Sequence, residues 1–485
     1  MSVRSFAAVC AAVICLCSCN KEQAELRHER YYVNTFALGM MSTYYLWSDE
    51  IEATFENWKA ADDPVQKVKD IRYKDRNGKD IDRWTQMLTS YSETINSMSG
   101  QTTSYGYDFL FYHIQENSDA LCAVVTLCYP NTPASDAGLK RGDVVLKING
   151  KDITMDNYQA LYSSDFLGGS ECSLTMMDGR SLEMKARAIY ENPVLACKVI
   201  DCGANKVGYL LYTSFTMESC ADLIEACKSM KAQGVSELVL DLRYNTGGYV
   251  AAENLLASML APEAAVENAE LYLIDRYNSL LTREWGVKET HFATEHTGKV
   301  NGKDYTYSTS GCNLNLDKIY VLTTGSTASA SESIIVGLLP YLPVEIIGDQ
   351  TSGKYCAGIM ESAKDWYKEN SKALKESKID ISEAWEYLGD WGMYVMISRY
   401  ADKNGDTPCM PDGFTPDTKA VDTPEDGIEL GDPSERLLNI ALVKAGYTGP
   451  STREASRAGR PLRRCENQPE RQTYRLFEPG SLESL

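Results

Sequence analysis

Histidine is scarce in this 485-residue chain, which contains only four: His28, His113, His291 and His296. Imidazole is the commonest metal ligand in proteins and the usual general base, so this scarcity argues against a histidine-based metal site or catalytic triad. The fifteen cysteines offer no substitute, because they include no Cys-x-x-Cys pair and no zinc-type spacing. We therefore expect no metal and no other cofactor.

Positive charge and long apolar runs are also lacking. The 48 Lys and Arg residues are outnumbered by 68 Asp and Glu, and the resulting net charge of −20 argues against nucleic-acid binding. No stretch after the N-terminus reaches the roughly 20 apolar residues that a membrane-spanning helix needs. Hydrophobic residues still make up 44% of the chain, which is enough for a sizeable core and excludes a wholly disordered protein.

The first 19 residues have the pattern of a secretory signal, in which a basic residue precedes an apolar run too short to span a bilayer. The end of this run, Leu16-Cys17-Ser18-Cys19, resembles a bacterial lipobox, whose last cysteine becomes the diacylated N-terminus. We expect Cys19 to anchor the protein to a membrane of the bacterial cell envelope, with residues 20–30 as a linker. The alternative is a simple cleaved signal in which Cys19 has no role.

The rest of the chain divides into segments of different character. Residues 31–100 show apolar positions at helical spacing, and Asp63 followed by Pro64 is typical of a helix start. Residues 104–190 contain short β-type runs separated by Asn-Gly and Asp-Gly turns, which predicts a small β-rich domain. Residues 191–448 alternate between strand and helix patterns, which predicts an α/β sheet with crossover helices.

The final segment, residues 449–485, changes composition again. Its last 35 residues contain seven Arg and no Lys, with little periodicity. This composition predicts a disordered tail. The alternative is a basic arm that binds a partner.

Two loops that follow predicted strands have residues suited to chemistry. The Ser-rich turn 324–332 would present a hydroxyl at a helix N-terminus, where backbone N–H groups can stabilise an oxyanion. Ser329 and Glu332 in this turn also match a capping box, which is a purely structural role. The pair Gly247-Gly248 allows the backbone to approach a ligand closely, or simply forms a tight turn.

A third loop, Gly348–Lys354, nearly matches a phosphate-binding loop, but residue 355 is Tyr where that motif needs Ser or Thr. Lys354 has another use, because burial lowers the pKa of a lysine toward about 7–8 and the neutral amine can then act as a base. A Ser–Lys dyad suits a chain with so little histidine.

The three loops together resemble the carboxyl-terminal processing peptidases, also called tail-specific serine peptidases. The matching pieces occur in the family's order: Leu240–Gly248, Ser326–Glu332 and Thr351–Lys354, with Lys354 placed 25 residues after Ser329. The resemblance implies that Ser329 is the nucleophile and Lys354 its base. It also implies that the N–H groups of Ala330 and of Gly247 or Gly248 hold the oxyanion. Ser331 and Ser333 do not keep this spacing and are weaker candidates.

The β-rich segment contains a second resemblance, since Ala137–Gly150 is similar to part of a PDZ domain. Such domains bind a C-terminal carboxylate in a loop of backbone N–H groups and add the bound polypeptide as a strand. The resemblance implies that Tyr105, Gly106 and Tyr107 form this loop, although an ordinary strand start is the alternative. The expected partners are therefore polypeptides bound by their C-terminal tails.

One position departs from the peptidase pattern. Many members of the family have Gln four residues after the lysine, where this chain has Gly358. Either Glu332 or Gln350 orients the amine instead, or the dyad is weak or inactive.

The resemblance implies an α/β, ClpP/crotonase-like peptidase core with an inserted PDZ domain and an N-terminal helical segment. The expected function is that of an envelope-anchored serine endopeptidase that cuts exported or misfolded polypeptides near their C-termini. The alternative is a catalytically silent peptide-binding lipoprotein of the same fold.

Overall fold

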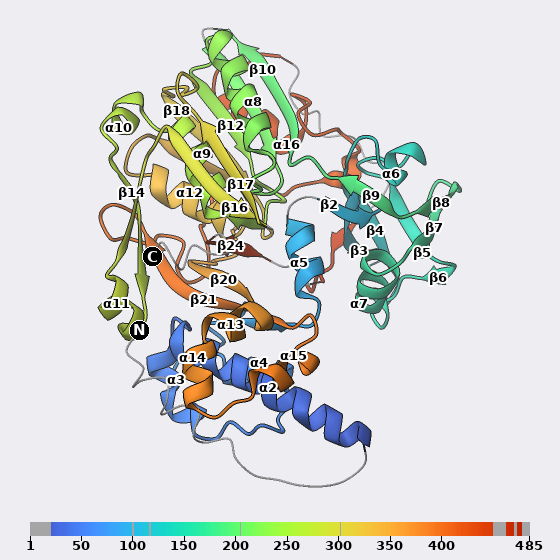
Figure 1. Cartoon of the computed structure of the whole chain (residues 1–485). Helices are drawn as coiled ribbons and strands as arrows, with labels where there is room; N and C mark the ends of the chain where they lie inside the picture. The colour runs from blue at the N-terminus through green and yellow to red at the C-terminus, as the bar shows by residue number, and fades with distance from the viewer. Residues whose placement is uncertain are drawn as a thin grey trace.

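The computed structural model describes residues 21–98, 101–115, 118–203, 205–300, 302–449, 462–469 and 473–477. The predicted signal and Cys19 lie outside these ranges. Three parts are visible in Figure 1: a layer of helices, a small β-rich domain and a larger α/β body. Over the described ranges, no helix combines the length and apolar character needed to cross a membrane, and the described cysteines form no disulfide.

The N-terminal segment is largely helical, as predicted, but its first helix already begins at Lys21, so the expected linker 20–30 is wrong for residues 21–30. Its elements are α2 (Lys21–Thr43), α3 (Ser48–Phe55), α4 (Pro64–Ile71), β1 (Gln86–Leu88) and α5 (Tyr91–Met98). The predicted start of α4 is confirmed, because the Asp63 carboxylate accepts hydrogen bonds from the N–H groups of Val65 and Gln66 at 3.0 and 3.3 Å. The segment packs against helices far along the chain, α13 (Ala363–Glu369), α14 (Ser371–Glu376) and α15 (Ile381–Tyr387), and shares the core of the α/β body.

The β-rich domain is built on one antiparallel sheet with a core of its own. Its strands are β3 (Tyr107–His113), β4 (Leu121–Cys128), β5 (Val144–Ile148), β6 (Lys151–Asp152), β7 (Glu171–Met176) and β8 (Ser181–Lys185). The helical elements are α6 (Pro133–Asp136), α7 (Tyr158–Ala160) and a π-helix (Leu161–Leu167). The paired strands β2 (Gln101–Ser104) and β9 (Arg187–Tyr190) connect this domain to the rest of the molecule.

The first sheet of the α/β body confirms the predicted alternation. Its order is β10 (Val194–Cys202), β11 (Asn205–Tyr212), β12 (Glu237–Asp241), β18 (Lys318–Thr323), β19 (Val344–Gly348) and β22 (Thr418–Lys419). All neighbours from β11 to β22 are parallel. Helices α8 (Cys220–Ala232), α9 (Val250–Leu260) and α12 (Ala330–Leu338) pack on one face, and α16 (Arg436–Lys444) packs on the other. Because parallel strands end at one edge, the loops that follow β12, β18 and β19 meet there.

A second sheet lies beside this edge and was not predicted. Its order is β13 (Gly247–Tyr249), β24 (Tyr474–Leu476), β20 (Cys356–Ser362), β21 (Gly392–Ala401), β14 (Leu271–Tyr277) and β15 (Lys288–His291), and β1 also pairs with β21. Nearby are the hairpin β16 (Glu295–Val300) and β17 (Lys303–Ser308) and helices α10 (Glu263–Glu267) and α11 (Ser279–Trp285). A 3₁₀ turn (Pro424–Asp426) packs against β4 of the β-rich domain.

The described parts of the C-terminal tail differ from the disorder that composition predicts. They contain β23 (Arg463–Arg464), which pairs with β3, and β24, which lies between β13 and β20 (Figure 1). Strands this short take their order from partners hundreds of residues away, so local composition gives no sign of them.

Candidate active site

Ser329 occupies a strained turn between β18 and α12. Its backbone has φ 66° and ψ −114°, a conformation that a residue with a side chain adopts only when its surroundings enforce it. The residue has no exposed surface. Its Oγ makes no hydrogen bond to any described residue, so this hydroxyl is not committed to the capping role that the sequence also allowed.

Hydrogen bonds of Asn245 connect the serine turn (324–332) to the glycine turn (Gly247-Gly248). Its carbonyl accepts from the N–H of Ala328 at 3.2 Å and from the Ser331 hydroxyl at 3.0 Å. Its side-chain Nδ2 donates to the carbonyl of Tyr212 at 3.0 Å, and its Oδ1 accepts from the N–H of Gly247 at 2.8 Å. Ser331 therefore has a structural partner, which weakens it further as a nucleophile.

The predicted oxyanion donors differ in availability. The N–H of Ala330, the first residue of α12, donates to no acceptor within the described ranges. The N–H of Gly247 is already bound by Asn245. The carbonyl of Gly247 and the N–H of Tyr249 both bond to Phe215, so the N–H of Gly248, between them, faces the opposite side, where β24 lies. Of the two glycines, Gly248 is the one whose N–H faces the position of an added strand, which β24 occupies in this structure.

A single carboxylate, that of Glu332, holds the two key loops together. Its Oε2 accepts from the N–H of Ser329 at 3.0 Å and from the N–H of Lys354 at 2.8 Å. Its Oε1 accepts from Thr351 Oγ1 at 2.5 Å and from the N–H of Gly353 at 2.7 Å. Burial raises the pKa of Glu332.

The same contacts argue against a phosphate-binding loop at Gly348–Lys354. The N–H groups of Gly353 and Lys354 that would cradle a phosphate are already bound by a carboxylate. The segment that follows is strand β20, whereas a phosphate-binding loop leads into a helix.

Lys354 is completely buried in an aromatic environment. Its Nζ donates to the hydroxyl of Tyr394 at 2.9 Å and to the carbonyl of Thr473 in the C-terminal tail. The ring of Trp84 lies 5.5 Å from Nζ. Burial lowers the pKa of Lys354 to about 7, so a large fraction of the amine is neutral near pH 7. The base chemistry expected of this residue therefore has the environment it needs.

Gly358 explains why no Gln side chain orients the amine. A Cβ at this position would lie 2.5 Å from the ring of Tyr394 and 2.7 Å from Met396. Tyr394 fills this space and reaches Lys354 Nζ instead. Of the predicted substitutes, Glu332 accepts a hydrogen bond from the backbone N–H of Lys354, and the Gln350 side chain donates to the carbonyl of Asp412. Sequence reasoning missed Tyr394 because 40 residues separate it from Lys354.

The predicted carboxylate-binding loop lies at the start of β3. Gly106 has φ 78°, and a Cβ there would lie 2.4 Å from Thr132, so this tight loop needs glycine. Its N–H donates to Ser104 Oγ at 3.1 Å, and its carbonyl accepts from the N–H of Tyr129. Tyr105 and Tyr107 are both buried.

A cleft of about 860 Å³ connects the β-rich domain with the serine turn. Its lining includes Leu110 of β3, Thr246 and Ser326 of the two turns and Tyr394, together with tail residues between Arg464 and Pro469 and Thr473. An extended polypeptide can follow this cleft from one domain to the other.

A buried charge network, also missed from the sequence, joins the β-rich domain to the glycine turn. Asp422 lies 2.7 Å from Arg141 of the β-rich domain and 3.0 Å from Arg243, the residue that follows β12 closely. Arg243 also pairs with Asp241 and Glu435, both at 2.8 Å. Burial opposes ionisation of Asp422, but Arg141 and Arg243 outweigh it and hold its pKa below the ordinary value.

Comparisons with known proteins confirm the predicted resemblance. Residues 206–420 match the family model described as peptidase family S41, and residues 124–166 match the model of a PDZ domain. A Staphylococcus aureus protein named "Probable CtpA-like serine protease" is 25% identical over 368 residues, which are 75% of this chain and 65% of that protein. A Picosynechococcus protein named "Carboxyl-terminal-processing protease" is 26% identical over 289 residues, 58% of this chain and 61% of that protein. The chain thus spans less than two thirds of the length of these relatives.

A solved structure confirms the fold. A chain from Bacteroides fragilis, described as a candidate S41 protease, superposes with a TM-score of 0.60 at 24% identity, over 84% of this chain and 97% of that one. The predicted α/β core with a PDZ domain is therefore correct. The wider likeness to ClpP and crotonase folds stays a prediction.

Proposed function

Because the chain contains a peptidase domain of family S41 and a PDZ domain, we propose that it is a serine endopeptidase with a Ser–Lys dyad. Its parts are a helical segment (31–100), a PDZ domain (104–190) and a peptidase domain (191–448). The observation that carries the proposal is the Glu332 carboxylate, which binds the N–H groups of both Ser329 and Lys354. This carboxylate holds the two loops together, and Ser329 Oγ makes no hydrogen bond to any described residue. The dyad forms when this hydroxyl comes within hydrogen-bond reach of Lys354 Nζ.

In the proposed reaction, Ser329 Oγ attacks the carbonyl carbon of a peptide bond. Neutral Lys354 takes the hydroxyl proton as the Oγ–C bond forms, and then gives that proton to the leaving amine as the C–N bond breaks. A water molecule next attacks the acyl-enzyme, again with Lys354 as base, and releases the new carboxyl terminus and free Ser329. The N–H groups of Ala330 and Gly248 hold the oxyanion in both steps.

Tyr394 takes the role that Gln has in many related peptidases. Its hydroxyl lies 2.9 Å from Lys354 Nζ, and its ring fills the space beside Gly358. The absence of Gln therefore does not by itself argue for an inactive protein. The catalytically silent peptide-binding alternative loses its main support.

The proposed substrates are exported or misfolded polypeptides, cut near their C-termini. The loop of Tyr105, Gly106 and Tyr107 at the start of β3 recognises the tail, which adds as a strand to the PDZ domain. The cleft of about 860 Å³ then leads the polypeptide toward the serine turn, which lines it at Gly325 and Ser326. We propose that Cys19 carries a lipid that tethers the enzyme in the bacterial cell envelope, with its folded domains in the periplasm or at the surface.

The test is cleavage of an unfolded protein such as reduced casein by wild type and by Ser329→Ala. We expect Ser329→Ala to lose at least about 10³-fold in rate, because no other group replaces the nucleophile. The matched control is Ser310→Ala, which removes the same hydroxyl from an exposed residue and should leave the rate unchanged. Equal rates for wild type and Ser329→Ala would eliminate Ser329 as the nucleophile.

A further inference from the structure

The described part of the C-terminal tail follows the route proposed for a substrate. β23 adds antiparallel to the edge of β3, with Arg463 opposite His113 and Arg464 opposite Tyr112. β24 lies between β13 and β20 and is parallel to both. The PDZ edge and the strand position beside the glycine turn are thus both filled by the chain itself.

At the PDZ domain, amide groups hold the tail. The N–H and carbonyl of Phe111 each bond to the Gln468 side chain at 2.8 Å. The same carbonyl accepts from the N–H of Cys465 at 2.9 Å, and the Tyr158 hydroxyl donates to the carbonyl of Asn467 at 2.7 Å. The N–H and carbonyl of Phe111 are backbone groups to which the backbone of any added strand can bond, so another polypeptide can replace the tail on this edge.

At the active site, the tail uses the groups that catalysis needs. The Thr473 carbonyl accepts a hydrogen bond from Lys354 Nζ. The N–H of Gly248 faces β24, and Ser329 has no exposed surface with the tail in place. A substrate and the tail cannot use these groups at the same time. A catalytic cycle therefore requires the tail to leave.

Arg475 fills a buried acidic pocket. Its Nε lies 3.0 Å from Glu253 and 3.1 Å from Ser333 Oγ, and its Nη1 lies 3.0 Å from Asp275. Its guanidinium also lies 4.7 Å from the ring centre of Tyr400. The fit is incomplete, because Arg475 Nη2 and Asp275 Oδ2 are buried with no hydrogen-bond partner in the described part of the chain. These unsatisfied atoms make the ion pairs weaker than a fully hydrogen-bonded set, which suits an occupant that can be exchanged.

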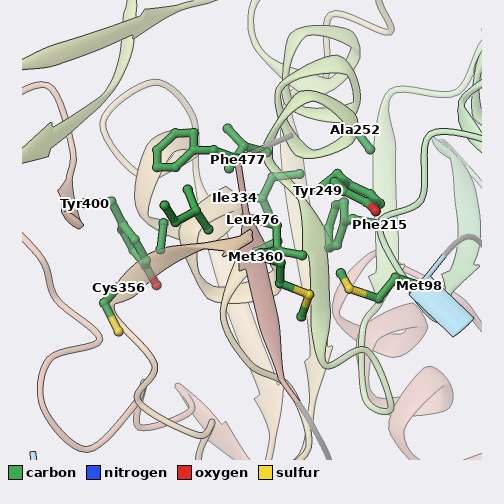
Figure 2. Close-up of a cluster of buried hydrophobic side chains, with 14 of the residues drawn as sticks. Met98, Phe215, Tyr249, Ala252, Ile334, Cys356, Met360, Tyr400, Leu476 and Phe477 are labelled. Carbon is green, nitrogen blue, oxygen red and sulfur yellow. The ribbon is translucent and has the colours of Figure 1, made fainter. Parts of the chain in front are cut away.

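Two apolar side chains of the tail, those of Leu476 and Phe477, are also buried. Leu476 and Phe477 are each 1% exposed. In Figure 2, Leu476 lies close to Ile334 of α12 and Met360 of β20, with Phe477 above them. The site that holds residues 475–477 therefore fits an extended strand in which a basic residue precedes apolar ones.

We propose that the described parts of the tail, residues 462–469 and 473–477, act as an intramolecular inhibitor that occupies the substrate path. When the tail leaves, the same site binds a polypeptide strand in which a basic residue is followed by apolar residues. The inference deepens the proposed function and depends on it for an activity readout, but its binding readout is independent of catalysis.

The first test inserts a recognition sequence for a site-specific protease between residues 455 and 456, so that the full chain folds with its tail and is then cut. In the Ser329→Ala background, binding of a labelled synthetic peptide of residues 462–477 is measured by fluorescence anisotropy. After the tail has been removed by gel filtration, we expect the peptide to bind at least about tenfold more tightly than to the intact chain, where the tail competes. Equal affinities would overturn the proposal. The control peptide with Arg475→Glu should bind the cut chain weakly.

The activity arm uses the same insertion with Ser329 present. We expect cutting to raise casein cleavage at least about tenfold, and the added peptide to suppress it. Equal cleavage before and after the cut would reject the inhibitor and leave the peptidase proposal intact. If neither form cleaves but the peptide still prefers the cut chain, the peptidase proposal fails and the tail remains a bound ligand.

A second variant, Arg475→Gln in the uncut chain, tests whether the tail inhibits the enzyme or is needed only for folding. An inhibitory tail predicts faster casein cleavage, because the closed state loses the ion pairs that hold it. A purely structural strand predicts the opposite, a loss of activity together with a lower melting temperature. Such a combined loss would overturn the proposal.

Discussion

At the scale of single residues, the proposed activity depends on how completely the Lys354 amine is shielded from water. Lys354 is completely buried, and the rings of Trp84 and Tyr394 lie 5.5 and 4.8 Å from its Nζ. Aromatic faces attract an ammonium group, but burial has the larger effect and lowers the pKa to about 7. The lysine can therefore act as a base at neutral pH, which an exposed lysine cannot do.

This pKa sets the expected pH dependence. Only the unprotonated amine accepts the serine proton, so kcat/KM should rise with pH through about 7 and then level off. Below pH 6 the rate should fall about tenfold per pH unit, because the neutral fraction falls by that factor. The measurement is cleavage of a soluble unfolded substrate between pH 4 and 9 with the tail removed. Lys354→Arg, which stays protonated, should be inactive throughout. A limb centred near pH 4–5 would instead indicate a carboxylate base.

At the scale of elements, β13 shows why the glycine pair is needed. Gly248 has φ 146°, and a Cβ there would lie 2.1 Å from the carbonyl oxygen of Phe215. The short strand is held between Phe215 and β24, so it cannot move aside without losing pairing. The pair is therefore more than a permissive turn, because it fixes the direction of one N–H.

Gly248→Ala should displace that N–H and lower kcat about 10²–10³-fold, the usual loss for one oxyanion donor, with a smaller change in KM. Gly286→Ala is the matched control. Gly286 also has positive φ, 76°, but a Cβ there would meet nothing within 4 Å, so backbone strain alone is tested. A normal kcat in a folded Gly248→Ala variant would mean that another group supplies the second donor.

At the scale of the whole molecule, buried charges join the PDZ domain to the peptidase domain. Arg141, Asp422 and Arg243 form a continuous chain of ion pairs that ends at the residue before Tyr244 and the glycine turn. Asp422 has a lowered pKa in the folded state, so its stabilising effect is complete at neutral pH. The effect is lost as the pH falls below the ordinary carboxyl range toward the folded value.

Arg141→Met should therefore destabilise the protein by about 3 kcal/mol at pH 7, because it removes one partner of a buried pair. Urea unfolding followed by tryptophan fluorescence measures the change, which should shrink as the pH is lowered. Arg180→Met is the control, since its side chain is 36% exposed and its pairs with Asp143 and Asp178 lie near the surface; it should cost less than about 1 kcal/mol. Equal costs would mean that the buried network adds nothing specific.

The sequence alone determined the local features of this protein. Strand and helix patterns predicted the first sheet, and Asp63 and Pro64 predicted the start of α4. These predictions succeed because periodicity and caps act over a few residues. The dyad of Ser329 and Lys354, which the family resemblance implied, stays a prediction. The tertiary structure alone decided what surrounds that pair: Tyr394 in place of Gln, the network around Arg243, and the tail strand that binds Lys354. The contacts of Lys354 with Tyr394 and of Arg141 with Asp422 join residues 40 and 281 positions apart. No local sequence pattern predicts them, because only folding brings such distant side chains together in the protein interior.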